Sequence, residues 1–200
     1  MVSPSDTTLI ATFYNVEPFM PVALKYPPQK IILVVNTTEG KVRQNISEIR
    51  KIFGKVARIE VERITGERVL DIAKRGVEII DREARQSTRI MVNLSGGLRP
   101  LANGLLYACY SRPEKIYRIV SDRDRKGGII ELPKLRYNLG STKYDVLKKI
   151  ATREDESISE MAKEMHKTRG MLYQHLKELK DGGYVDEDFK ITDAGRLALL

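Results

Sequence analysis

The sequence predicts an α/β fold: a Rossmann-like, mostly parallel sheet with a terminal antiparallel hairpin, followed by an α-rich winged helix-turn-helix domain. The first part is predicted by strand-like and helix-like segments that alternate up to about residue 120, and by strands that are almost continuously apolar. The second part is predicted by short, capped helices that begin at Ser141. We therefore expect a domain over residues 1–134, a linker over 135–140 and a second domain over 141–200.

The strands of the first domain are predicted from runs of β-branched, apolar residues. Lys30 to Val35 reads KIILVV, as expected for a strand that is covered on both faces. The other expected strands span residues 8–13, 56–61, 88–94 and 115–120, and a polar turn over 121–128 leads into a hairpin strand over 129–132. The expected helices span residues 39–53, 67–85 and 98–110, where apolar side chains recur every three or four positions. This alternation implies right-handed crossovers.

The tail is predicted to form three short helices, a small hairpin and a last helix that starts after Thr192 and runs to Leu200. Ser157 and Glu160 have the spacing of a capping box, and Thr168 is placed to cap the third helix. In a winged helix the third helix enters the major groove, where Arg and Gln contact bases and Lys and Thr contact phosphates. The candidate DNA-binding residues are Lys167, Thr168, Arg169, Gly170, Tyr173, Gln174 and Lys177.

The charge of the chain is unevenly distributed. The formal net charge is +8, but residues 1–137 hold 24 Lys and Arg against 15 Asp and Glu, whereas residues 138–200 hold 11 against 12. The positive excess therefore lies in the first domain, and the net charge of the tail does not argue for DNA binding. The hairpin tip at residues 186–188 is acidic, which would repel phosphate and favours a protein-contact role for the tail.

Cysteine content and hydropathy limit the remaining classes. The single cysteine, Cys109, excludes an intrachain disulfide and is expected to be a buried structural thiol. His166 and His175 do not form a metal-binding pattern, so no metal site is expected. No run approaches the roughly 20 apolar residues of a membrane span, and no signal peptide is recognisable, so a cytoplasmic location is expected.

The candidate ligand site follows the fourth expected strand, where residues 93–100 read NLSGGLRP before a helix. Two glycines let a backbone approach a ligand closely, and the start of a helix favours phosphate. Ser95 can add a hydroxyl and Arg99 a charged fork at the carboxyl end of the strand. The loop is neither a Gly-x-Gly-x-x-Gly fingerprint nor a P-loop, so it does not predict NAD. Taken alone, it is equally well interpreted as a structural turn.

Several features together resemble one family, the CRISPR-associated Rossmann-fold (CARF) winged-helix transcriptional regulators of archaea. These are the NLSGG loop, the polar end of the first strand at residues 12–15, the terminal hairpin and the winged helix. The resemblance implies a homodimer that binds a cyclic oligoadenylate, typically cyclic tetra-adenylate, across its two-fold axis. It further implies that ligand binding repositions the winged helices on double-stranded DNA of CRISPR-locus promoters, in antiviral defence. The implied ligand-binding residues are Thr12, Phe13, Tyr14, Asn15, Asn93, Ser95, Gly96, Gly97, Leu98 and Arg99. The family loop often reads Gly-Gly-Thr-Lys, and here Leu98 and Arg99 replace its last two residues.

Two other classes of function are left open by the sequence. One is a ring nuclease, which cleaves cyclic oligoadenylate by positioning a ribose hydroxyl in line with its phosphate. We expect no catalysis, because neither loop shows a His, Glu or Asp general base and the tail lacks the Arg-to-His motif of the usual ribonuclease partner domain. The other is a protein-binding adaptor of a CRISPR effector assembly, which the acidic hairpin tip favours. The outward Arg169, Gln174 and Lys177 favour the transcriptional regulator.

Overall fold

The computed structural model describes residues 7–66, 68–86, 89–122, 128–135, 139–152 and 157–200. It divides into two compact units, Met1–Arg136 and Tyr137–Leu200, and each is described by itself below. The expected starts of the third helix and of the fourth strand, at residues 67 and 88, lie outside the described residues. So do parts of the polar turn and of the linker.

The N-terminal unit is built on a six-stranded sheet with the order β3-β2-β1-β4-β5-β6. β1 to β5 pair in parallel and β6 pairs antiparallel with β5, so the predicted parallel sheet with a terminal hairpin is confirmed. The strands are β1 (Thr7–Phe13), β2 (Lys30–Val35), β3 (Arg58–Arg63), β4 (Arg89–Gly96), β5 (Ile116–Asp122) and β6 (Ile129–Leu132).

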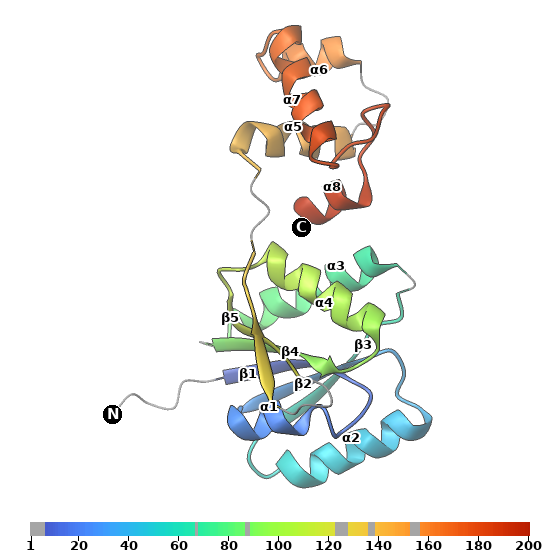
Figure 1. Ribbon diagram of the computed structural model, residues 1–200, viewed down its shortest axis with the longest axis vertical. Coiled ribbons are helices and arrows are strands. Elements are labelled where there is room, and N and C mark those ends of the chain that lie inside the picture. Colours follow the sequence, from blue (N-terminus) through green and yellow to red (C-terminus); the bar gives the residue numbers. More distant parts are fainter. Residues whose placement is uncertain (1–6, 67, 87–88, 123–127, 136–138, 153–156) are drawn as a thin grey trace, which may run out of the picture. The chain divides into compact units, whose positions relative to one another are not determined.

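Four helices cover the sheet: α1 (Met20–Lys25), α2 (Gly40–Phe53), α3 (Val69–Glu83) and α4 (Arg99–Ser111). α1 and α2 lie on one face and α3 and α4 on the other (Figure 1). The sequence analysis missed α1, because six residues that begin with Met20 and Pro21 are too few to show a helical period. The chain changes faces between β1 and β4, which makes their junction the topological switch point of the sheet.

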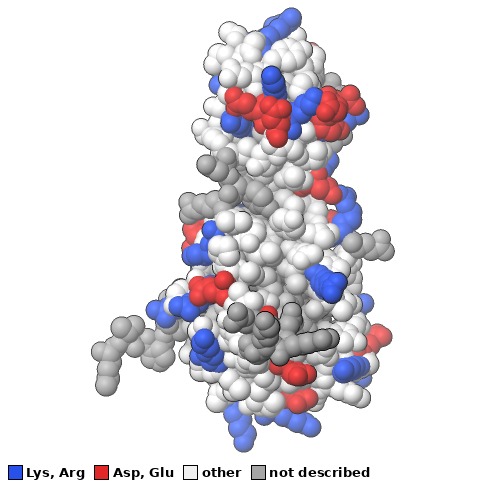
Figure 2. All heavy atoms as spheres, viewed as in Figure 1, with Lys and Arg blue, Asp and Glu red and all other residues white. Residues whose placement is uncertain are grey.

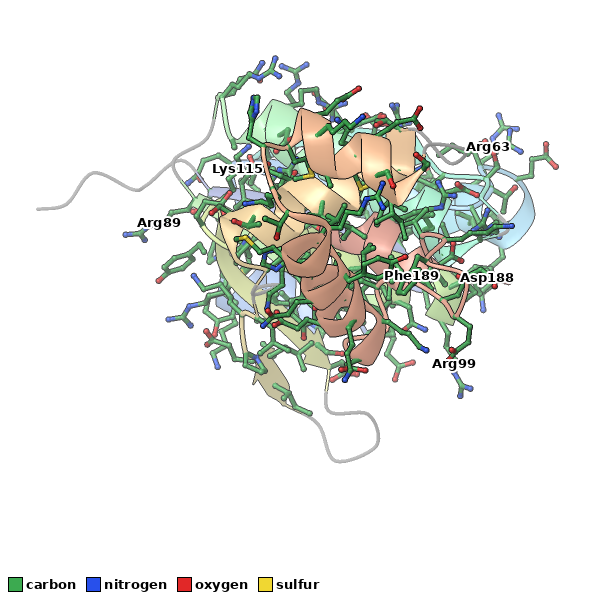
Figure 3. All side chains as sticks on the ribbon, turned by 90° about the horizontal axis from the view of Figure 1, so that it is seen from above. Arg63, Arg89, Arg99, Lys115, Asp188 and Phe189 are labelled. Atoms are coloured by element: carbon green, nitrogen blue, oxygen red, sulfur yellow. The ribbon has the colours of Figure 1, made fainter. Side chains whose placement is uncertain are left out.

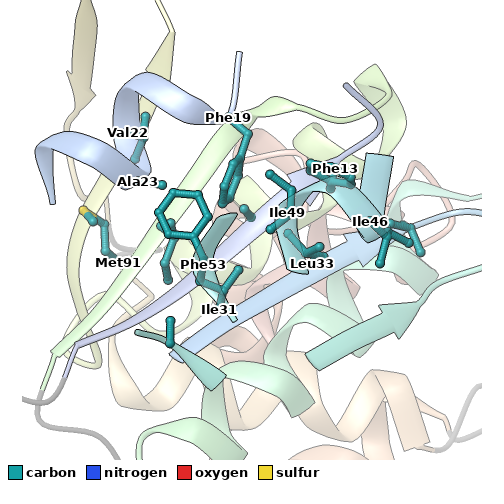
Figure 4. Packing of buried hydrophobic residues seen from close by; sticks show 14 of the residues in the cluster. Phe13, Phe19, Val22, Ala23, Ile31, Leu33, Ile46, Ile49, Phe53 and Met91 are labelled. Atoms are coloured by element: carbon teal, nitrogen blue, oxygen red, sulfur yellow. The ribbon is translucent and has the colours of Figure 1, made fainter. Parts of the chain in front are cut away.

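The core beneath α1 and α2 is anchored by aromatic side chains (Figure 4). The Phe13 and Phe19 rings meet edge to face with centroids 5.7 Å apart, and Phe19 meets Phe53 in the same way at 6.0 Å. Such pairs contribute about 0.5–1.5 kcal/mol beyond the burial of their area. These ring contacts hold the loop after β1 against the end of α2.

On the other face, α3 and α4 pack closely against each other. A Cβ atom at Gly104 would lie 2.4 Å from Ile72 Cγ2, and one at Gly76 would lie 2.8 Å from Ala108 Cβ. The two glycines therefore set the distance at which these helices pack. Cys109 of α4 is fully buried, as a structural thiol should be.

The third strand was misplaced by the sequence analysis, which expected residues 56–61 where β3 spans Arg58–Arg63. The amides of Val56 and Ala57 both donate to the Phe53 carbonyl, so the turn that ends α2 includes both residues. Val56 is accordingly 71% exposed. Because Val56 is apolar, the sequence pattern indicated a strand that begins at this residue, although it lies in the turn.

The C-terminal unit contains α5 (Ser141–Thr152), α6 (Ile158–Glu164), α7 (Arg169–Asp181) and α8 (Asp193–Ala198). The predicted caps are confirmed: Ser157 and Glu160 form the capping box of α6, Thr168 caps α7, and Thr192 caps α8. α8 ends at Ala198, two residues earlier than expected. The core of this unit consists of Val146, Leu147, Ile150, Met161, Ala162, Leu172, Leu176, Leu179, Val185 and Ile191.

The hairpin of the C-terminal unit is smaller than predicted. In place of two short strands, one isolated bridge joins Val185 to Ile191. The Asp186 carboxylate accepts hydrogen bonds from the amides of Asp188 and Lys190, and Phe189 has a φ of 58°. This tight turn begins directly after Val185 and ends directly before Ile191, so no further residue pair fits on that side of the bridge. Among the described helices of the chain, none is both long and apolar enough to cross a bilayer.

Candidate functional site

The candidate ligand site lies where β1 and β4 run side by side at the centre of the sheet. The chain leaves these strands toward opposite faces, and in open α/β sheets such a switch point opens a crevice at the carboxyl ends of the strands. The two loops singled out from the sequence contact each other here. The Gly96 carbonyl accepts hydrogen bonds from the Tyr14 amide at 2.6 Å and from the Asn15 amide at 3.0 Å.

Packing against β1 explains why the loop contains two glycines, without reference to a ligand. A Cβ atom at Gly96 would lie 3.0 Å from the Thr12 carbonyl oxygen. A Cβ atom at Gly97 would lie 2.5 Å from Thr12 Cβ and 3.0 Å from the Phe13 amide nitrogen. The contact at Gly97 is closer than a side-chain carbon tolerates and the one at Gly96 is tight, so the glycines allow the loop to pack against the end of β1.

The Ser95 hydroxyl has two partners within the sheet. Its Oγ donates to Asn93 Oδ1 at 2.5 Å and accepts from the Asp122 amide at 2.6 Å. Asn93 Oδ1 also accepts from the Ser95 amide at 3.0 Å. Ser95 therefore joins the carboxyl ends of β4 and β5, and its hydroxyl positions the loop where the sequence analysis expected it to face a ligand.

Two buried polar atoms at this junction have no hydrogen-bond partner among the described residues. They are Thr12 Oγ1 at the end of β1 and Asn93 Nδ2 near the end of β4, and both residues are fully buried. Leaving such a group unpaired costs about 1–3 kcal/mol. These atoms are unused hydrogen-bonding capacity beside the loop that precedes α4.

The start of α4 presents the one cation of the predicted loop. Leu98 occupies the N-cap position without a side-chain hydrogen bond to the helix, and it is 40% exposed. Arg99 is exposed and projects from the same edge of the unit as Arg63 (Figure 3). A helix start whose amides have no side-chain cap, next to an exposed guanidinium, favours an anion. Pro100 removes one amide from this first turn.

Three predicted residues at the end of β1 and directly after it take different positions. Phe13 is fully buried against Phe19, so its side chain belongs to the core. Tyr14 and Asn15 are half-buried at the edge, and the Tyr14 carbonyl accepts a hydrogen bond from Asn45 Nδ2 at 2.7 Å. The sequence analysis missed Asn45 and Asp122, because a polar residue on α2 or at a strand end shows nothing of its partner in its local pattern.

The candidate DNA-binding helix is α7. The Thr168 hydroxyl accepts from the Met171 amide at 3.2 Å, so it caps the helix. Lys167 is half-buried before this cap, and its amide donates to the Ala162 carbonyl in the turn after α6. The remaining predicted contacts share the exposed face opposite the buried leucines: Arg169, Gly170, Tyr173, Gln174 and Lys177. A Cβ atom at Gly170 would meet nothing within 4 Å, so this face is open at the start of the helix.

The hairpin tip is held against α7. The Tyr173 ring meets the Phe189 ring edge to face at 6.5 Å, and Lys180 pairs with Glu187. Gln174 donates to Glu178 at 3.3 Å, and the hydrogen bond from Lys143 is the main reason why the pKa of Glu178 is lowered. The sequence analysis missed Phe189, whose left-handed backbone is set by the turn of the hairpin.

Comparisons with known proteins give a family model for part of the C-terminal unit only. Residues 140–187 match the model of the bacterial regulatory protein, arsR family, so the C-terminal unit is a helix-turn-helix of this type. No curated protein sequence matches the chain.

Among solved structures, the chain is similar to protein VC1899 from Vibrio cholerae, with 11% identity and a TM-score of 0.51, over 96% of this chain and 56% of that one. It is also similar to Can2 from Sulfobacillus thermosulfidooxidans in complex with cyclic tetra-adenylate, with 14% identity and a TM-score of 0.45, over 97% and 63%. A third likeness is to Enterococcus italicus Csm6 bound to cyclic hexa-2'-fluoro-hexa-dAMP, with 13% identity and a TM-score of 0.49, over 90% and 56%. The chain thus spans less than two thirds of each of these proteins, and at such identities the likeness concerns the fold alone.

Fold and family model together define a class: a Rossmann-like domain followed by an ArsR-type helix-turn-helix. This is the architecture of the CARF winged-helix proteins that the sequence resembles, so the resemblance is confirmed in the order and type of its parts. In the described part of the chain, no three His, Cys, Asp or Glu side chains converge as metal ligands.

Proposed function

We propose that this chain is a ligand-responsive, DNA-binding transcriptional regulator of CRISPR-Cas loci. The proposed effector is a cyclic oligoadenylate, in the first instance cyclic tetra-adenylate, held between two copies of the N-terminal unit. The observation that carries the proposal is the contact between the loop after β1 and the Gly-rich loop at the switch point of the sheet. The choice of effector follows from the CARF resemblance of these loops.

In this proposal the chain's own groups have distinct tasks. Arg99 and the start of α4 bind phosphate, because a guanidinium and the helix dipole both favour negative charge there. Asn93 Nδ2 and Thr12 Oγ1 are unpaired and fully buried, so they become available to polar ligand atoms when the Gly-rich loop above them shifts on binding. Ser95, Gly96 and Gly97 position the loop through the contacts given above. Because a cyclic tetra-adenylate is itself symmetric, a two-fold dimer presents two equal sets of these groups to it.

The effector is tested by calorimetric titration of the purified protein with cyclic tetra-adenylate, with linear tetra-adenylate and NAD as controls. We expect one cyclic ligand per two chains. Arg99→Ala should abolish this binding, or weaken it at least tenfold, since a charge-assisted hydrogen bond contributes about 1.5–3 kcal/mol. Arg43→Ala, which removes another exposed arginine from the N-terminal unit, is the matched control. Normal binding by Arg99→Ala would show that the ligand pocket lies elsewhere.

The proposed DNA binding is tested with duplex DNA that the protein selects from a random-sequence pool. Arg169→Ala should weaken binding to the selected duplex and leave effector binding intact, whereas Arg99→Ala should do the reverse. One bidentate base contact is worth about 1–3 kcal/mol of discrimination. If neither the native protein nor its effector complex selected any sequence, the protein-binding adaptor would be the better description.

A second candidate function, cleavage of the cyclic effector, is favoured by one specific observation. The end of β5 lies against the Gly-rich loop, because the backbone amide of Asp122 donates to Ser95 Oγ, so a residue with a carboxylate is next to a loop in which the sequence analysis had found no general base. Incubation of the protein with cyclic tetra-adenylate and chromatography of the products tests this candidate. Linear products that disappear in Asp122→Asn would establish a ring-opening activity, and recovery of intact ligand would exclude it.

A further inference from the structure

The edge of the sheet opposite the candidate ligand site carries interleaved basic and aromatic side chains. Arg118 Cζ lies 5.1 Å from the Tyr117 ring centroid and 5.5 Å from that of Tyr26. Arg89 Cζ lies 4.9 Å from the Tyr117 ring centroid, and Lys25 Nζ lies 5.4 Å from that of Tyr26. We call these five residues the amino-edge cluster, because they lie near the amino ends of the parallel strands.

A β-bulge places the centre of this cluster on the surface. Ile90 pairs with Ile116, but the next residue, Met91, pairs with Arg118, so Tyr117 is an extra residue in β5. Bulges change the direction in which neighbouring side chains point. Tyr117 is 42% exposed, whereas Ile116 beside it is 2% exposed.

Ordinary structural causes explain part of the cluster. Basic residues at helix ends interact favourably with the helix dipole, which accounts for Lys25 at the end of α1. On the face drawn in Figure 2, basic and acidic side chains are interspersed, so charge alone does not mark a site. Arg89 and Arg118, however, lie on strands, where no helix end requires a cation. The Arg118 guanidinium already has two partners: it lies 3.4 Å from a Glu131 carboxylate oxygen and donates to the Tyr26 hydroxyl at 3.2 Å.

The amino edge lies away from the effector loops within the N-terminal unit. Figure 3 shows Arg89 and Lys115 at one edge of the unit and Arg63 and Arg99 at the other. A polyanion on the cluster would therefore not compete with a ligand at the Gly-rich loop. The cluster contributes three cations to the positive excess of the N-terminal unit, whereas the Gly-rich loop contributes one.

The chain leads from this edge into the C-terminal unit. β6 returns antiparallel to β5, and its last residue, Leu132, pairs with Ile119. Lys134 then donates from Nζ to the Ile116 carbonyl at 3.0 Å beside the cluster. The nine residues from Leu132 to Ser141 span at most about 30 Å. A tether this short keeps DNA that is bound by the C-terminal unit at a high local concentration around the amino edge.

We propose that the amino-edge cluster is a second DNA-contacting surface, which binds phosphates of the duplex that flanks the sequence read by α7. The inference rests on the proposed function, because that function requires the C-terminal unit to bind DNA. The tyrosine rings hold the guanidinium groups of Arg89 and Arg118 in place, and the planar fork of N–H donors of an arginine suits a phosphate. Such contacts add affinity without reading sequence.

The test measures affinity for a 30-base-pair duplex of mixed sequence by fluorescence anisotropy between 50 and 300 mM salt. Each phosphate contact contributes about 0.9 to the slope of log K against log salt, so Arg89→Ala/Arg118→Ala should lower that slope by about 1.8. The matched control, Lys41→Ala/Arg43→Ala, removes the same charge from exposed positions at the start of α2 and should leave the slope unchanged. Arg89→Gln/Arg118→Gln, with longer polar side chains, repeats the test if the alanine variant unfolds.

The outcomes separate this inference from the proposed function. A wild-type protein that binds no duplex would overturn both. A wild-type protein that binds duplex, with the same slope in the amino-edge variants as in the control, would overturn only the second surface. Tighter binding of a single-stranded RNA than of the duplex, lost in the same variants, would assign the cluster to single strands and would also overturn the duplex proposal.

Discussion

Replacing Gly97 by alanine would place a methyl group between the Gly-rich loop and the end of β1. The new Cβ would lie 2.5 Å from Thr12 Cβ, 2.9 Å from Thr12 Oγ1 and 3.0 Å from the Phe13 amide nitrogen. Thr12 Cβ and the Phe13 nitrogen cannot move without shifting β1, a central strand that pairs with both β2 and β4. Such overpacking typically costs about 1–3 kcal/mol. For a unit of this size, that corresponds to a fall in melting temperature of roughly 3–10 °C.

The assay is differential scanning calorimetry of the full chain. Leu176→Ala, which removes a buried side chain from the C-terminal unit, identifies the transition of that unit, so the transition of the N-terminal unit can be followed separately. Gly170→Ala is the matched control, because a Cβ atom there meets nothing within 4 Å. Thr12→Gly removes the clashing carbon, and the double variant with Gly97→Ala should recover part of the lost stability. A melting temperature of Gly97→Ala equal to that of the native protein would refute the contact between the loop and β1.

Two further predictions concern single titratable groups. Burial raises the pKa of Asp81, but the hydrogen bonds from Lys115 and Arg112 outweigh it, so the net pKa is lowered. The stabilisation by this group is present above the unfolded pKa of about 3.9 and is lost as the pH falls through the lower folded value. Urea unfolding between pH 2 and 6 should therefore show a smaller acid loss for Asp81→Asn, and an identical loss would contradict the assignment. Burial also raises the pKa of the Cys109 thiol, so a thiol reagent such as iodoacetamide at pH 8 should label the protein only when it unfolds. Rapid labelling of the native protein would show that α4 opens readily.

Patterns within a few residues of the sequence determined much of this protein. Apolar runs predicted the strands, three- and four-residue spacings predicted α2 to α4, and the capping residues predicted where α6, α7 and α8 begin. These signals are local, because capping and helical periodicity act over three to four positions. The Gly-rich loop and the outward face of α7 were found in the same way.

Only the tertiary structure decided what those residues contact. The pairing of β1 with β4 joins segments about 80 positions apart, and it makes Gly97 necessary for packing and leaves little room beside Gly96. The neighbouring end of β5 engages the Ser95 hydroxyl, which the sequence analysis had assigned to a ligand. The bulge that exposes Tyr117 likewise depends on the register between β4 and β5. Register and crossover packing depend on strands that are distant in the chain, so no local pattern of residues encodes them.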